Sequence, residues 1–140
     1  MAEIKDRILA ELENIDKVII ELSNCGKLSE MSTIEISGVG ALLHNFYNGI
    51  ENVVKQVFID QGLALPSGTF WHKDLIEIAE KENILSSSTK KGLAPFLAFR
   101  HFFVHGYSLN LRPELMVPLI DEMQIIYKEF KKDLQRKKLI

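Results

Sequence analysis

The sequence predicts an all-α fold, a bundle of about five helices that run up and down. Apolar residues recur at three- and four-residue spacing along most of the chain, which is the period of an amphipathic helix. No segment shows the alternation of apolar and polar residues typical of a half-buried strand. With 140 residues, of which 46% are hydrophobic and 26% charged, the chain has the composition of an ordinary globular protein. We therefore expect a single domain over residues 1–140.

The first two predicted helices cover residues 2–24 and 33–61. Cys25-Gly26 ends the first of them, and Ser32 or Thr33 can cap the second. Because both have one apolar face and a short connection joins them, we expect an antiparallel pair. His44 lies among apolar residues of the second helix, and we interpret it as a hydrogen-bonded histidine at the edge of the core.

Three further helices follow. A loop over residues 62–69 leads through Trp71-His72 into a helix that extends to about residue 85. Serines and a threonine at 86–89 break the pattern and can cap the next helix, which begins near residue 88. Pro95 either kinks that helix or marks its first turn. Pro113 suits the first turn of the last helix, and Pro118 is expected to kink it early.

The groups best suited to phosphate chemistry are concentrated in residues 100–107. This stretch holds Arg100, His101, His105 and Tyr107 around three apolar residues, and Gly106 is a plausible end of the helix. His101 and His105 are one turn apart and share a helix face. Arg100 and His105 differ by about 140° in an ideal helix, so they converge only if the helix widens locally or a second copy of the chain contributes.

This stretch resembles the signature of HepT-like ribonuclease toxins, which belong to the HEPN superfamily: an arginine, four residues, a histidine, one residue and a tyrosine. Arg100, His105 and Tyr107 match it position by position, and the polar His101 suits the same pattern. The order of the helices around the motif is also similar to that of HepT-like proteins from about Thr33 onward. The resemblance implies a HEPN-type helical bundle and a two-fold homodimer with RNA as its substrate.

The residues of the motif fit the chemistry that the resemblance implies. RNA supplies its own nucleophile, the ribose 2′-hydroxyl, so cleavage needs a base, an acid and a cation for the transition state. Histidine can serve either proton role, and arginine presents a charged fork to phosphate oxygens. Arg100 and His105 are therefore the candidate catalytic residues, and a dimer would supply His105 twice. His101 and His72 are possible auxiliary residues, and we expect no metal and no other cofactor.

Tyr107 has a separate meaning in this resemblance. In HepT-like proteins the matching tyrosine receives AMP groups from a partner nucleotidyltransferase, which is the antitoxin. The resemblance thus implies Tyr107 as the modification site. Added AMP would place negative charge and bulk beside the RNA site and so inhibit cleavage.

Other functions remain open from the residues alone. A non-catalytic helical module that binds a nucleotide or a partner protein is the main alternative, with Arg100 as a phosphate clamp. His101 and His105 have the spacing of two zinc ligands, but no third ligand is evident nearby. Cys25 stands in a turn without an adjacent histidine, which disfavours thiol chemistry as the function.

Charge and hydropathy indicate how the protein would bind RNA and in which compartment we expect it. The formal net charge is −2, so any RNA binding would use a local basic patch, such as the lysines of the motif helix or of the C-terminal helix. The single cysteine allows no internal disulfide. No apolar run reaches the roughly 20 residues of a membrane span, and we see no signal peptide. We therefore expect a cytoplasmic protein that does not associate with membranes.

Overall fold

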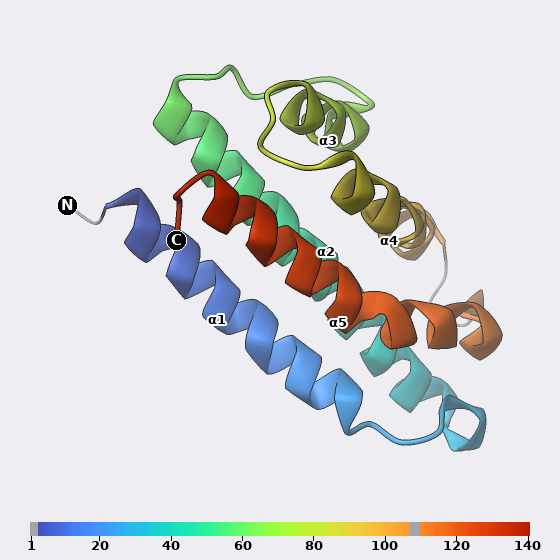
Figure 1. The fold of residues 1–140 in the computed structure, drawn as a ribbon. Helices are drawn as coiled ribbons and strands as arrows, with labels where there is room; N and C mark the ends of the chain where they lie inside the picture. Colours follow the sequence, from blue (N-terminus) through green and yellow to red (C-terminus); the bar gives the residue numbers. More distant parts are fainter. Residues whose placement is uncertain (1–2, 107–109) are drawn as a thin grey trace.

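The computed structural model describes residues 3–106 and 110–140 of the chain, and over them it confirms the all-α prediction. Figure 1 shows the helices in order. They are α1 (Ile4–Ser23), the short 3-10 helix η1 (Leu28–Glu30), α2 (Thr33–Gln61), α3 (Trp71–Lys81), α4 (Ser87–His105) and α5 (Pro113–Arg136). No strand is present in these residues.

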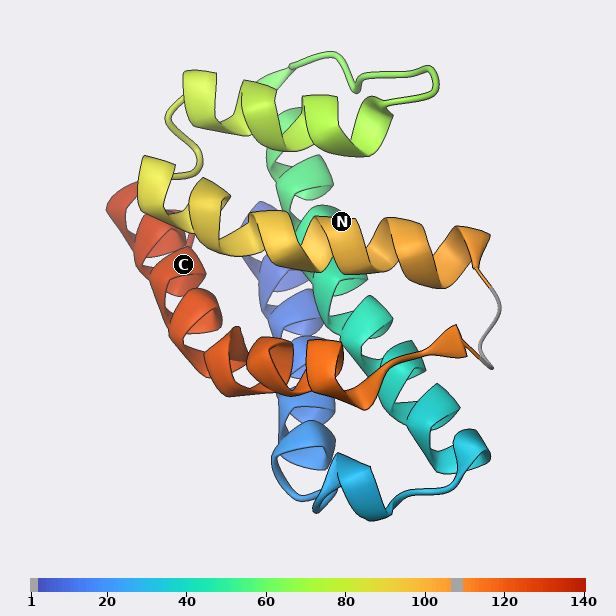
Figure 2. The ribbon, with the colours of Figure 1, turned by 90° about the vertical axis from the view of Figure 1, so that its right-hand side faces the viewer.

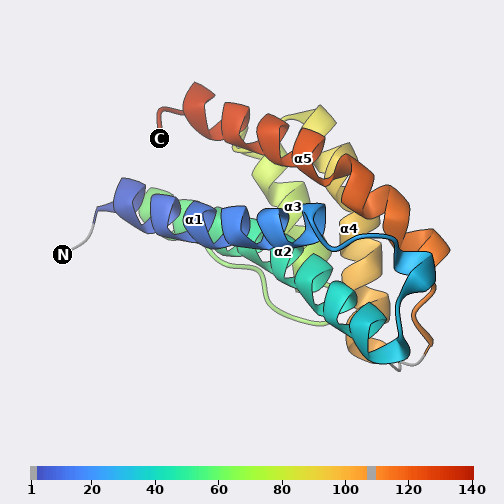
Figure 3. The same cartoon turned by 90° about the horizontal axis from the view of Figure 1, so that it is seen from below.

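Helix α2 is the centre of the bundle. It runs antiparallel to α1, as predicted (Figure 1), and it also contacts α3, α4 and α5. Helices α3 and α4 lie side by side and cross α2 at a steep angle, which is clearest when the molecule is seen from the side and from below (Figures 2 and 3). They run in opposite directions, so the start of α3 lies beside the C-terminal half of α4 (Figure 2).

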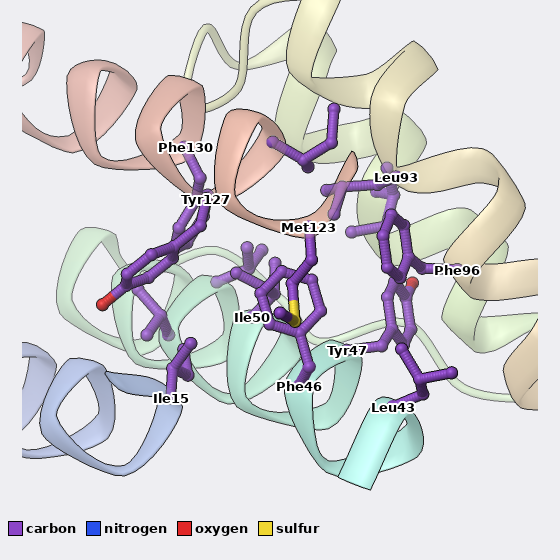
Figure 4. Close-up of a cluster of buried hydrophobic side chains, with 14 of the residues drawn as sticks. Ile15, Leu43, Phe46, Tyr47, Ile50, Leu93, Phe96, Met123, Tyr127 and Phe130 are labelled. Carbon is purple, nitrogen blue, oxygen red and sulfur yellow. The ribbon is translucent and has the colours of Figure 1, made fainter. Parts of the chain in front are cut away.

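The core contains aromatic and aliphatic side chains from each of the α-helices α1 to α5. Figure 4 shows Ile15 of α1, Phe46 and Tyr47 of α2, Phe96 of α4 and Tyr127 of α5 converging on one another. The ring of Phe46 lies 5.2 Å from that of Phe96 and 6.3 Å from that of Tyr127, measured between centroids. Thirteen of the 29 residues of α2 are buried, and Glu51 is the one charged residue among them, whereas polar residues such as Asn45 and Gln61 face solvent.

Local signals explain where most helices begin and end. Ser32 caps α2 in a capping box with Glu35, which gives that helix the predicted start. Gly26 and Gly62 take left-handed backbone conformations in the turns that follow α1 and α2. The predicted extension of the third helix to about residue 85 is wrong, because α3 ends at Lys81 and Asn83 turns left-handed, with φ 58°.

Prolines have different effects in α4 and α5. Helix α4 begins at Ser87 under a cap from Ser86, so Pro95 lies inside a continuous helix rather than at its start. Helix α5 begins with Pro113 at its first turn, as predicted, and it bends in its N-terminal part, where Pro118 removes a backbone donor (Figure 2).

Close approach of α1 and α2 depends on Gly49. A Cβ atom at Gly49 would lie 2.5 Å from Cγ1 of Ile15, which is buried, whereas a Cβ at Gly38 would meet nothing within 4 Å. We expect Gly49→Ala to lower the free energy of unfolding by about 1 kcal/mol, since overpacking outweighs the gain in helix propensity. Gly38→Ala is the matched control and should raise it by up to about 1 kcal/mol. Urea unfolding of both variants measures the difference, and equal stabilisation by both would contradict the close approach.

Candidate functional site

The predicted site residues of the motif lie at the C-terminal end of α4. Helix α4 is anchored at its other end, where Ser86 donates its backbone N–H to the buried carboxylate of Asp133 at 3.0 Å and accepts a bond from the Thr89 N–H at 3.1 Å. The helix is α-helical as far as His105, without local widening, and Gly106 continues in an extended conformation. Arg100 and His105 therefore keep the offset of about 140° expected for an ideal helix.

Arg100 faces α2. Its side chain is half-buried, and its Nε is fully buried without a hydrogen-bond partner. Phe103, one turn further along α4, stacks on the ring of His44 in α2 at 5.4 Å between centroids. The face of α4 that carries Arg100 and Phe103 is thus packed against the face of α2 that carries His44.

His101 and His105 lie on the exposed side of the same helix. Their rings are 4.6 Å apart between centroids and both side chains are exposed. A single chain therefore presents two accessible imidazoles on one side of α4 and a half-buried guanidinium on another. Within the part of the chain that the structure describes, no group of three or more His, Cys, Asp or Glu residues could hold a metal ion.

A polar cluster extends inward from Arg100 over α2 and α3. His44, Tyr47 and Glu51 follow one another at spacings of three and four residues, so they share one face of α2. Glu51 is 1% exposed, and both of its carboxylate oxygens lie within hydrogen-bond distance of Nδ1 of His72, at 2.9 Å for Oε1 and 2.8 Å for Oε2. His72, a predicted auxiliary residue, is thereby fixed at the start of α3 beside Glu51.

Burial and the charge of Arg100 control titration in this cluster. Burial lowers the pKa of His44, and the positive charge of Arg100 lowers it further. Burial also lowers the pKa of His72, against the opposing effect of the Glu51 carboxylate. The pKa of the Tyr47 hydroxyl is raised by burial and by the nearby charge of Glu51. Both histidines are therefore favoured in the neutral form at pH 7.

Two features of the cluster differ from the sequence interpretation. His44 lies at the edge of the core, as expected, and forms a side-chain hydrogen bond with Asn45, but its buried Nε2 has no partner. The sequence reasoning also missed Glu51. The sequence contained a signal for Glu51, because this carboxylate lies one helical turn from Tyr47 and two turns from His44 and interrupts an otherwise apolar stretch of α2.

Tyr107 lies outside the described residues, so its predicted role as the modification site stays a prediction. The regular helix ends at His105, which means that a helical offset from Arg100 cannot be used to place it.

The lowered pKa of His44 predicts a dependence of stability on pH. The unfolded chain binds a proton near pH 6.5, whereas folded His44 does so only at lower pH, so stability should decrease as the pH falls below about 6.5. His44→Gln removes the titration and should reduce that decrease. Chemical unfolding between pH 8 and pH 5 measures it, and the two proteins should have the same pH dependence above about pH 7.5. A parent protein that grows more stable on acidification would contradict the prediction.

None of the helices in residues 3–106 and 110–140 has both the length and the apolar character that crossing a membrane requires.

A family model described as HepT-like protein matches residues 38–138, which span most of α2, all of α3 and α4, and almost all that follows. No curated protein and no solved structure matches the chain. The match confirms the resemblance based on residues 100–107 and on the helices around them. The chain belongs to the HepT-like family.

Proposed function

We propose that this protein is a cytoplasmic endoribonuclease, the toxin of a HepT/nucleotidyltransferase pair, and that Arg100 and His105 carry its activity. At the level of the family, HepT-like proteins are HEPN-type ribonuclease toxins. The observation that carries the proposal for this chain is the arrangement at the end of α4. A guanidinium is held against a polar cluster, and exposed imidazoles lie on the same two turns of helix.

The reaction is a transesterification that needs no metal. A base takes the proton of the ribose 2′-hydroxyl, whose oxygen then attacks the phosphorus. The bond from phosphorus to the 5′-oxygen breaks, and an acid gives that oxygen a proton, which leaves a 2′,3′-cyclic phosphate and a 5′-hydroxyl. Arg100 stabilises the additional negative charge on the phosphate oxygens, and His105 supplies one of the proton transfers.

The surface around the motif supports the proposal of a homodimer. Phe102 and Val104, on the motif helix itself, are 43% and 46% exposed. Beside them, a groove of about 420 Å³ between α4 and α5 is lined mainly by apolar residues, including Phe99 and Leu115. Apolar surface of this kind at a motif that needs two histidines favours a second copy of the chain, which would bring its own His105.

Substitutions at the motif test the activity. We expect Arg100→Ala and His105→Ala to lower the rate of RNA cleavage at least about 100-fold, because each removes a group that acts in the transition state. Arg100→Lys is the matched variant for charge: it should retain part of the activity, since it keeps the charge but loses the fork. Circular dichroism should show that all three remain helical. If both alanine variants cleave like the parent, the assignment of the site is wrong, and if the parent binds RNA or nucleotides without cleaving any RNA, the non-catalytic module is the better description.

The same assay tests the dimer. Phe102→Glu places a charge on the exposed apolar surface beside the motif and should yield monomers with little cleavage. Ile20→Glu is the control, since Ile20 is 58% exposed on α1, away from the motif, and this variant should sediment and cleave like the parent. A parent protein that cleaves as a monomer would contradict the requirement for two chains.

We also expect control by AMP addition at Tyr107, which matches the tyrosine of the family motif. Negative charge from AMP next to the motif would compete with RNA for Arg100. Tyr107→Phe removes only the acceptor oxygen, so this variant should cleave RNA and should remain toxic in cells that carry the partner nucleotidyltransferase. Mass spectrometry of the parent protein after co-expression should show added AMP on the peptide that contains residue 107. Full inhibition with an unmodified peptide would defeat this mechanism.

A further inference from the structure

We propose that His72, oriented by the buried carboxylate of Glu51, is the base of the Arg100 site and is supplied by the same chain as Arg100. This inference rests on the proposed ribonuclease function and extends it, because the family motif assigns a proton-transfer role only to His105. The bond between His72 and Glu51 joins the first turn of α3 to α2, and the start of α3 lies beside the C-terminal half of α4 (Figure 2).

The hydrogen bond fixes which nitrogen of His72 is available. Since both carboxylate oxygens of Glu51 lie 2.8–2.9 Å from Nδ1, this nitrogen carries the proton and donates it to the carboxylate. The other nitrogen, Nε2, is left with a lone pair. The side chain of His72 is 18% exposed, so the imidazole is not sealed in the core. The ring of Trp71 lies 3.5 Å from the imidazole, between centroids, and restricts its rotation.

The surroundings of His72 connect it to Arg100. Glu51 and Lys55 of α2 and Arg100 of α4 are the charged groups that act on it, and the two positive charges oppose its protonation. The same Arg100 charge acts on His44 and Tyr47, the other polar residues of the α2 face. The stacking of Phe103 on His44 shows that this face of α2 and the Arg100 face of α4 are in contact. The charge of Arg100 therefore reaches His72 and His44, on the side of α4 that packs against α2, whereas His101 and His105 lie on the exposed side.

The cluster also holds polar atoms that lack partners. Nε of Arg100 and Nε2 of His44 are buried and make no hydrogen bond, and the buried hydroxyl of Tyr47 lies within reach of the Glu51 carboxylate alone. Buried polar groups without partners are costly, so their accumulation in one place indicates that this region is built for polar chemistry. RNA cannot reach the buried atoms, but the side chain of Arg100 is partly exposed. A phosphate diester bound to this guanidinium would bring its ribose toward His72.

In the resulting step, Nε2 of His72 takes the proton of the 2′-hydroxyl as that oxygen bonds to phosphorus. The bond to the 5′-oxygen breaks, and His105 in its protonated form gives that oxygen its proton. Atoms and charges balance without a further reactant. Glu51 does not touch the substrate. It is a positioning residue, which holds Nδ1 protonated and stabilises the imidazolium that forms.

A purely structural role for the pair is the alternative, in which the bond only ties α3 to α2. The pH dependence of cleavage separates the two. The rate should rise with pH as His72 loses its proton, and the Glu51 carboxylate raises the pKa of His72. Removing its charge lowers that pKa, so in Glu51→Gln the rise should move to lower pH. A structural contact would not move it.

The experiment is single-turnover cleavage of RNA from pH 5 to pH 9 by the full chain and its variants. We expect Glu51→Gln, which keeps an acceptor for Nδ1, to lose roughly 10- to 100-fold in rate and to show the shift to lower pH. His72→Gln should lose at least about 100-fold. Glu80→Gln is the matched control. Glu80 is also a carboxylate on α3 and forms an ion pair, with Lys90 of α4 at 3.3 Å. It lies outside the polar cluster around Arg100, so this variant should keep the cleavage rate and the pH dependence of the parent.

A second measurement does not depend on cleavage or on any substitution at His72 or Glu51. NMR of the parent protein follows the imidazole signals of His72 while an RNA oligonucleotide with a 2′-deoxy residue at the cleavage position is added. The His72 signals of the parent protein should shift when the oligonucleotide is added, whereas those of the Arg100→Ala variant should not. If the parent cleaves RNA but His72→Gln keeps its rate, or if the His72 signals do not respond to the oligonucleotide, the proposal is overturned while the ribonuclease function stands. If the parent cleaves no RNA, the ribonuclease function fails, and the role of His72 as its base fails with it.

Discussion

The contact of α2 with every other α-helix is the constraint on which the rest of this structure depends. The residues that these contacts bury must either be apolar or be matched by polar groups from a neighbouring helix. Most are apolar, and the aromatic contacts of Phe46 join α2 to α4 and α5. Glu51 is the exception with the greatest consequence. An ionised carboxylate loses its hydration on burial. This loss costs roughly several kcal/mol unless a hydrogen-bonding partner replaces the water. His72 is that partner.

An apolar pair at these two positions could hold α3 against α2 at least as well, because a buried ionic pair often gives no net stability over well-packed apolar side chains. The same reasoning applies to the unpaired Nε of Arg100 and Nε2 of His44, and to the buried hydroxyl of Tyr47 beside Glu51. One such group in a core is a local defect, whereas several on facing surfaces of α2 and α4 are a cost that stability alone does not explain. Functional sites commonly contain such buried polar groups, which lower the stability of the fold but provide the environment that polar chemistry needs.

The sequence predicted the all-α fold, the antiparallel pair and the site helix because those features depend on local patterns: helical periodicity, capping serines and prolines at helix starts. The start of α2 at Thr33 follows from the capping box of Ser32 and Glu35, which lies within four residues. The end of α3 was missed because it depends on a left-handed turn at Asn83, a residue that is compatible with several conformations. The pairing of Glu51 with His72 was missed for a different reason. It joins positions 21 residues apart, and nothing in the period of either helix fixes how α3 lies on α2.

The two sides of α4 clarify why one chain carries several histidines near a single arginine. A regular helix cannot direct Arg100 and His105 at the same phosphate from the same chain, because they are about 140° apart. Suppose that the base and the acid were the two His105 side chains of a dimer. Each His105 would then lie on a different side of its helix from Arg100, whose guanidinium faces α2. In the proposed site, His72 and Arg100 belong to one chain and His105 to its partner, so the two proton transfers would come from different chains. Such an arrangement would suit an in-line displacement, in which the attacking and leaving oxygens lie on opposite sides of phosphorus. The buried Glu51–His72 pair and an apolar dimer surface would then be two parts of one site rather than competing explanations of it.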